Sequence, residues 1–156
     1  MTLRPFFAFL MAALFVLPAC DTAEEDRLTE ADFVGIWDLV QVTDGSGDRS
    51  GEAFGLLDEF QLTFESGGSF ELFVDLNDTI NQDGTPDTTI PGVYSLSEAG
   101  QLILNVGAIA PAFTVDNGTA NRLGLSTSAV IINTLLAGSG VDLDLTGTVT
   151  LIVAKN

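Results

Sequence analysis

The chain has 156 residues, enough for one domain of ordinary size, and 46% of them are hydrophobic. Its 22 acidic and five basic residues give a net charge of −17, which opposes binding to nucleic-acid phosphates. The lack of histidine excludes Ser-His-Asp and Cys-His nucleophilic sites and histidine metal ligands, and a single cysteine leaves no disulfide. We therefore expect an acidic globular protein that is not an enzyme and that has no cofactor and no nucleic-acid partner.

The N-terminal residues have the order of a secretory targeting segment. Arg4 is followed by an apolar run over residues 6–16, which is too short to span a bilayer and fits the hydrophobic region of a signal peptide. The run leads to LPAC, which ends at the only cysteine, Cys20. The alternative, a core helix with a buried cysteine, does not explain the acidic residues that follow. We expect a signal peptide over residues 1–19, an acidic tether over 20–28 and one domain over 29–156.

Alternation of apolar and polar residues dominates the rest of the chain and predicts β structure. Residues 28–34 predict a short helical turn capped by Thr29 and Asp32. Residues 128–137, SAVIINTLLA, are apolar nearly all round and predict a short packed helix before the last strand, with a buried strand as the alternative. Eight strands are predicted between clusters of Gly, Asp, Asn and Pro: residues 35–43, 60–65, 69–76, 92–97, 101–106, 112–116, 121–126 and 147–154.

The second and third predicted strands form a hairpin whose register follows from their apolar faces. A three-residue loop over 66–68 places Phe64 opposite Phe70 and Leu62 opposite Leu72, so that one face is wholly apolar. A two-residue loop would mix apolar and polar residues on both faces. Eight short strands joined mostly by tight loops predict an all-β, up-and-down antiparallel barrel. Such a barrel has no free edges and has room for packed side chains or one small ligand.

Three short motifs resemble the lipocalin-like domains of small bacterial lipoproteins. They are a Gly-x-Trp at Gly35 and Trp37, LTFESGGSF over residues 62–70, and GVYSL followed by LIL over residues 92–104. Taken alone, Gly35 and Trp37 also fit any strand that starts at a glycine and buries a tryptophan. LPAC resembles the lipobox of bacterial lipoproteins, at which a peptidase cuts before a cysteine that carries a lipid.

The resemblance implies a lipocalin-like barrel whose closed end is plugged by Trp37, with Gly35 allowing the turn into the strand. A lipid on Cys20 would anchor it to a membrane of the bacterial cell envelope, the outer membrane. We expect it to bind a small hydrophobic ligand; the alternative is a barrel filled by its own side chains that acts as a structural or protein-interaction lipoprotein with an unknown partner. The candidate interior and ligand-lining residues are Gly35, Trp37, Phe60, Leu62, Phe64, Phe70 and Leu72.

One polar loop between the third and fourth predicted strands has part of a calcium-binding pattern. Asn81, Asp83 and Asp87 offer oxygen ligands around a glycine, as in half of a calcium loop. The first ligand position holds Thr79 and the terminal acidic position holds Ile90, so a solvated loop is the alternative. We expect no metal site, with calcium at this loop as the one candidate.

Overall fold

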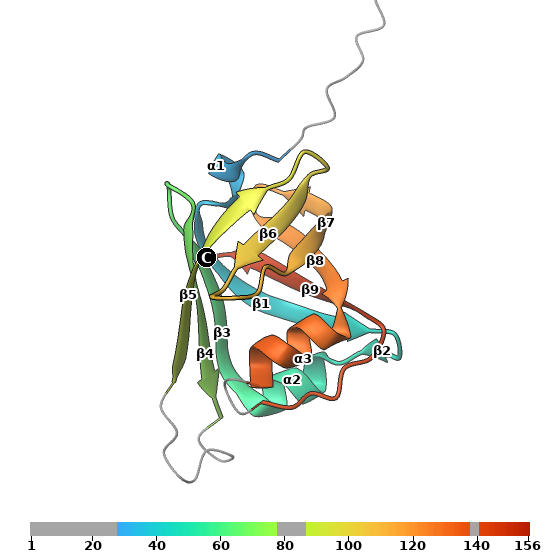
Figure 1. The fold of residues 1–156 in the computed structure, drawn as a ribbon. Coiled ribbons are helices and arrows are strands. Elements are labelled where there is room, and N and C mark those ends of the chain that lie inside the picture. Colours follow the sequence, from blue (N-terminus) through green and yellow to red (C-terminus); the bar gives the residue numbers. More distant parts are fainter. Residues whose placement is uncertain (1–27, 78–86, 138–140) are drawn as a thin grey trace, which may run out of the picture.

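The computed structural model describes residues 28–77, 87–137 and 141–156 (Figure 1). The predicted signal peptide, Cys20 with most of the tether, Asn81 and Asp83 lie outside the described residues. The described elements, in chain order, are α1 (Glu30–Phe33), β1 (Gly35–Asp44), β2 (Gly47–Asp48), α2 (Ser50–Leu56), β3 (Leu57–Phe64), β4 (Ser69–Leu76), β5 (Thr88–Leu96), β6 (Gln101–Asn105), β7 (Ala112–Thr119), β8 (Arg122–Ser128), α3 (Ala129–Ala137) and β9 (Thr148–Lys155).

Eight of these strands form a closed antiparallel barrel in the order β1-β3-β4-β5-β6-β7-β8-β9. The barrel closes because β1 also pairs with β9, while β2 is a two-residue strand against the end of β1. Alternation along each barrel strand directs apolar side chains inward, where they form one continuous core. The predicted all-β, up-and-down barrel is confirmed.

The predicted hairpin between β3 and β4 is confirmed residue by residue. Phe64 pairs with Phe70, and Leu62 pairs with Leu72. In the three-residue loop between them, Gly67 has a φ angle of +121°, a conformation that glycine adopts without a steric penalty. The predicted helix before the last strand is also present as α3, so the alternative of a buried strand there is wrong.

Two strands begin earlier than predicted. β3 starts at Leu57, and its register shifts between Leu57 and Glu59, so the alternation that marks the rest of the strand is broken there. β5 starts at Thr88 and includes Pro91, which pairs with Glu71 although proline normally argues against a strand. β2 and α2 were not predicted, and α2 contains two glycines, which lower helix propensity.

α1 lies at one end of the barrel (Figure 1), and a group of aromatic side chains packs there. Trp37 and Phe33 are completely buried, and the Nε1 of Trp37 donates to the carbonyl oxygen of Phe33 at 2.6 Å. The Phe64 ring contacts Phe33 edge to face, with centroids 5.9 Å apart, and Tyr94 in the same way at 4.9 Å. Trp37 therefore ties α1 to β1 at this end of the barrel, which we call the closed end.

Gly35 makes room for Lys155, which contacts Trp37. The φ angle of Gly35 is +134°, and a Cβ atom there would lie 2.6 Å from the Cε of Lys155. Lys155 is the Cα partner of Trp37 across β1 and β9, and its Nζ lies 5.2 Å from the centroid of the indole ring, within cation–π range. No role was predicted for Lys155 from the sequence.

Candidate ligand site at the mouth of the barrel

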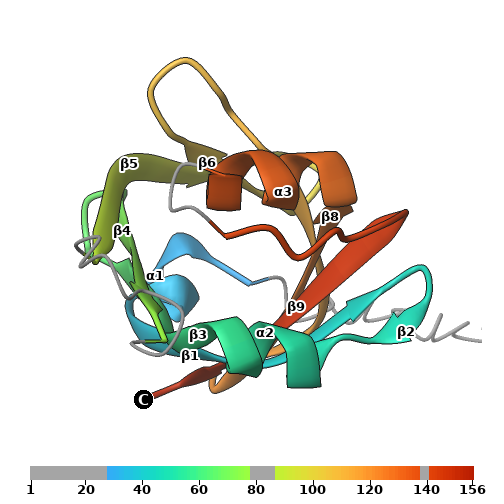
Figure 2. The same cartoon turned by 90° about the horizontal axis from the view of Figure 1, so that it is seen from below.

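α3 and residues 141–146 cover the other end of the barrel, which we call the mouth (Figure 2). β8 ends at Ser128 and β9 begins at Thr148, and these two residues are Cα partners in the ladder between the strands. The chain therefore leaves the barrel and returns to it at a single point. We call α3 together with residues 141–146 the cap.

The cap presents an apolar face to the barrel, and its residues 141–146 present a polar face to solvent. Along residues 141–146, Val141, Leu143 and Leu145 are buried while Asp142 and Asp144 are exposed. The buried residues of α3 are Ala129, Ile132, Leu135 and Leu136. The alternation over residues 141–146 is typical of a strand, but these residues are not part of a β-ladder. No secondary structure was predicted for residues 141–146.

Beneath the cap lies a cavity of about 30 Å³ with only apolar side chains around it. A volume of this size is enough for a water molecule. Sites for drug-sized ligands measure about 300–1,000 Å³, so the cavity with the cap in place is too small for such a ligand. The barrel strands form the wall of the cavity with Leu39, Val42, Leu57, Phe60, Leu62, Leu72, Leu104, Phe113, Leu125 and Leu151. The cap lines the cavity with Ile132, Leu135, Leu136, Leu143 and Leu145.

The candidate interior residues divide between the two ends of the barrel. Phe60, Leu62 and Leu72 line the cavity at the mouth, where Leu62 and Leu72 are buried and Phe60 is half-buried. Trp37 and the ring of Phe64 belong to the closed end. Two further candidates also lie there: Gly35 pairs with Phe64, and the Phe70 ring lies 6.1 Å from the Phe64 ring. Three of the candidates, Phe60, Leu62 and Leu72, thus line the cavity at the mouth.

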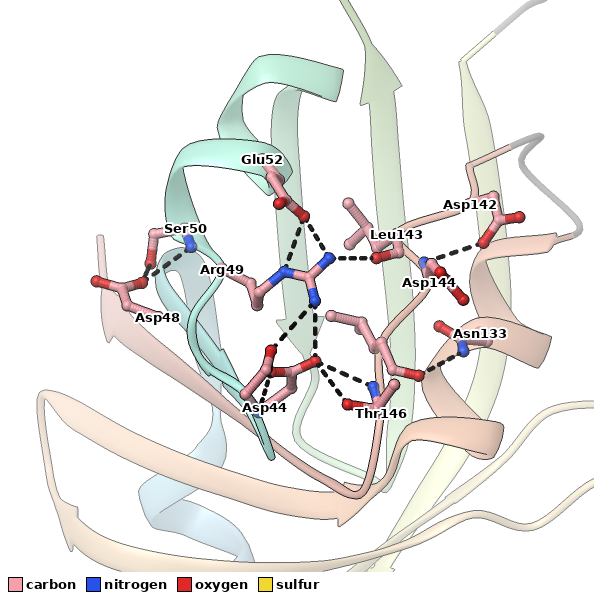
Figure 3. A network of polar contacts seen from close by, with 12 residues as sticks. Asp44, Asp48, Arg49, Ser50, Glu52, Asn133, Asp142, Leu143, Asp144 and Thr146 are labelled. Atoms are coloured by element: carbon pink, nitrogen blue, oxygen red, sulfur yellow. Dashed lines mark hydrogen bonds and ion pairs between the residues drawn. The ribbon is translucent and has the colours of Figure 1, made fainter.

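Arg49 joins the cap to the rim of the barrel through a network of polar contacts (Figure 3). Its Nη2 donates to the carbonyl oxygen of Leu143 at 2.9 Å, and its Nη1 lies 3.1 Å from the Oδ2 of Asp44. Its Nε donates to Glu52 at 2.8 Å. The same Asp44 oxygen accepts the backbone N–H of Thr146 at 3.0 Å, and the Asp44 side chain is fully buried.

Hydrogen bonds keep the two central groups of this network ionised. The hydroxyl of Ser46, with the N–H groups of Thr146 and Ser46 and the charge of Arg49, holds the pKa of Asp44 well below its usual range. The hydrogen bond to Glu52, assisted by the charges of Glu52 and Asp44, raises the pKa of Arg49. Arg49 therefore contacts the cap as a cation at neutral pH.

Exposed carboxylates lie at the rim of the mouth on the side of α2 and the start of β3. Glu52, Asp142 and Asp144 lie beside Arg49, and Asp58 and Glu59 lie at the start of β3. The negative charge of this rim repels an anionic amphiphile, but it does not repel an uncharged hydrophobic molecule. The site therefore combines an apolar interior with a negatively charged rim on this side.

The candidate calcium residues are not brought together in the part of the chain that the structure describes. Asp87 is exposed directly before β5, and Asn81 and Asp83 lie outside that part. Among the described residues, no group of three or more His, Cys, Asp or Glu side chains is arranged to hold a metal ion. None of the described helices has the length and apolar character required to cross a membrane.

Fold and site together define a small, closed antiparallel barrel with an apolar mouth under a separate cap. Comparison of the chain with models of protein families found no match, and a search of curated proteins found none either.

Proposed function

We propose that this protein is a lipid-anchored, lipocalin-like lipoprotein of the bacterial cell envelope that binds a small, uncharged hydrophobic molecule at the mouth of its barrel. The observation that supports this proposal best is the composition of the mouth. Its wall is apolar all round, and the space inside the wall is occupied by side chains of a segment inserted between two adjacent strands, β8 and β9.

A ligand would take the place of the cap side chains. Ile132, Leu135 and Leu143 fill the mouth against the wall in the closed arrangement. A hydrophobic molecule in their position would make the same type of contact with the wall, at about 25 cal/mol for each Å² of apolar surface removed from water. The lining has no polar group to pair with a polar ligand, and burying such a ligand without a partner would be costly.

The second candidate is a barrel filled by its own side chains, which acts through its surface as a structural or protein-interaction lipoprotein. The cavity volume of about 30 Å³ favours this candidate, because the closed barrel has no room for a ligand of a few hundred daltons. The two candidates differ in whether a ligand displaces the cap, which a binding experiment decides.

The binding experiment uses the protein from a bacterial envelope and two fluorescent probes of similar size. N-phenyl-1-naphthylamine, which is uncharged, should bind saturably with rising fluorescence, while the anionic anilinonaphthalene sulfonate should bind at least about tenfold more weakly because of the acidic rim. Native mass spectrometry of the same preparation should show a bound molecule of a few hundred daltons. A bare polypeptide mass with no response to either probe would favour the filled barrel.

The lipid anchor is tested by replacing Cys20 with serine. We expect complete loss of metabolic labelling by a fatty-acid analogue and of membrane association, because serine offers no thiol for a thioether-linked lipid. Thr22→Ser is the control and should leave both unchanged, since it keeps the only cysteine. A Cys20→Ser variant that stays labelled and membrane-bound would refute the anchor while leaving the barrel site untested by that result.

A further inference from the structure

We propose that the cap opens and closes as one unit about the Ser128–Thr148 pair, and that the contact of Arg49 with Leu143 stabilises the closed position. The role of this movement in admitting a ligand rests on the proposed function. The movement itself concerns only the cap and the rim of the barrel, and it is measured without a ligand.

The two described parts of the cap are bonded to each other. The Nδ2 of Asn133 on α3 donates to the carbonyl oxygen of Leu145 at 3.1 Å. The backbone N–H of Val141 donates to the carbonyl oxygen of Leu136, the second-to-last residue of α3, at 3.3 Å. These contacts lie within the cap and need not break when it moves as one body.

The cap is attached to the barrel at one side, which forms the hinge. Ser128 and Thr148 are partners at the end of the ladder between β8 and β9, and Ala129 donates to the carbonyl oxygen of Gly147 at 2.9 Å directly beside them. Gly147 has a φ angle of +67°, a region that glycine enters freely. Thr146, next to the hinge, is held by Gly45 and Asp44.

Arg49 holds the cap at a point further from the hinge. The carbonyl oxygen of Leu143 is not part of a β-ladder, and the guanidinium of Arg49 satisfies it. Asp44 and Glu52 fix this guanidinium from the barrel side, so it stays in place when Leu143 leaves. The bond between Arg49 and Leu143 is a single charged hydrogen bond, so it favours the closed cap without preventing opening.

The cap contains one buried side-chain polar atom without a hydrogen-bond partner among the described residues, the Oδ1 of Asn133. A buried acceptor without a donor is unfavourable compared with the same atom in water. The closed cap therefore carries one polar atom whose hydrogen-bonding capacity is not used.

Hydrogen exchange of the full-length protein, followed by mass spectrometry without ligand, tests the movement. In the wild type, the amides of α3 and residues 141–147 should exchange faster than those of β4 and β8, because the cap opens locally. The exchange rate of the cap amides should depend little on low concentrations of urea. Arg49→Ala should increase exchange in the cap by about tenfold and leave β4 unchanged. Arg122→Ala is the matched control: it removes the same charge from an exposed position on β8 and should leave the cap unchanged.

The outcomes separate this inference from the proposed function. Equal protection of the cap and the barrel strands in the wild type would overturn the inference, even if Arg49→Ala fails to fold. A folded Arg49→Ala variant with unchanged exchange in the cap would overturn the role of Arg49. If the cap exchanges as expected but N-phenyl-1-naphthylamine does not bind, the ligand proposal alone is overturned. If the probe associates faster with Arg49→Ala than with the wild type, opening of the cap controls entry of the ligand.

Discussion

Replacing Trp37 with alanine is expected to lower the free energy of unfolding by about 3–5 kcal/mol, the range for removal of a buried aromatic side chain. Trp37 is completely buried, donates to the carbonyl oxygen of Phe33 and lies under Lys155. Its loss leaves a cavity at the closed end and an unsatisfied carbonyl in α1. Because domains of this kind are stable by only about 5–15 kcal/mol, this change removes a large share of the total.

Urea unfolding followed by far-ultraviolet circular dichroism measures this effect without relying on the fluorescence of the residue removed. Trp37→Phe should lose less than Trp37→Ala, because it keeps an aromatic ring but not the hydrogen bond to Phe33. Val130→Ala is the control, since Val130 is 74% exposed on α3, and should change stability by no more than about 0.5 kcal/mol. If Trp37→Ala unfolds at the same urea concentration as this control, the plug at the closed end does not stabilise the barrel.

Replacing Gly92 with alanine is expected to destabilise the barrel by about 1–3 kcal/mol, because the interior has no room for one more methyl group. A Cβ atom at Gly92 would lie 2.4 Å from the backbone oxygen of Asn105 and 2.4 Å from the Cε1 of Phe70. Relief of the first contact requires a shift of β6 against β5, since a backbone oxygen cannot rotate away as a side chain does.

Gly55→Ala is the matched control for this substitution. Gly55 lies in α2, and a Cβ atom there would meet no other atom within 4 Å. Alanine is better than glycine in a helix by about 0.5–1 kcal/mol, so the control should be stabilised. Thermal unfolding of both variants should therefore shift in opposite directions. A Gly92→Ala variant as stable as the wild type would show that β5 and β6 can separate at this point without cost.

The barrel was predictable because the burial of each strand determines the pattern of apolar and polar residues in its sequence. Each barrel strand has one face toward the core, so inward residues recur with a period of two, as Phe60, Leu62 and Phe64 do in β3. The same period determines the register with β4, because only one loop length places Phe64 beside Phe70. The alternation of apolar and polar residues therefore determined the β3–β4 pairing, whereas the starts of β3 and β5, where it is broken, were missed.

The contacts between the cap and the barrel were not predictable for the opposite reason: they join distant positions in the chain. The VDLDL sequence over residues 141–145 has the period of a strand, but its partners are the barrel interior and the side chain of Arg49. α2 contains two glycines and depends on its place beside β1 and β3. Lys155 could have been noticed as the only lysine of the chain. Its contact with Trp37 could not have been predicted, because it forms only when β9 pairs with β1 and closes the barrel.

Closure of the barrel has a consequence for how the chain folds. Most ladders of the barrel join strands that follow one another along the chain, but the ladder between β1 and β9 joins Trp37 to Lys155. Contacts between such distant residues carry a large loop-closure cost and form late. A chain that is synthesised or translocated from its N-terminus therefore remains an open sheet until β9 emerges. During that time its free edges are open to pairing with other chains, so the last strand protects the protein from aggregation as well as completing the fold.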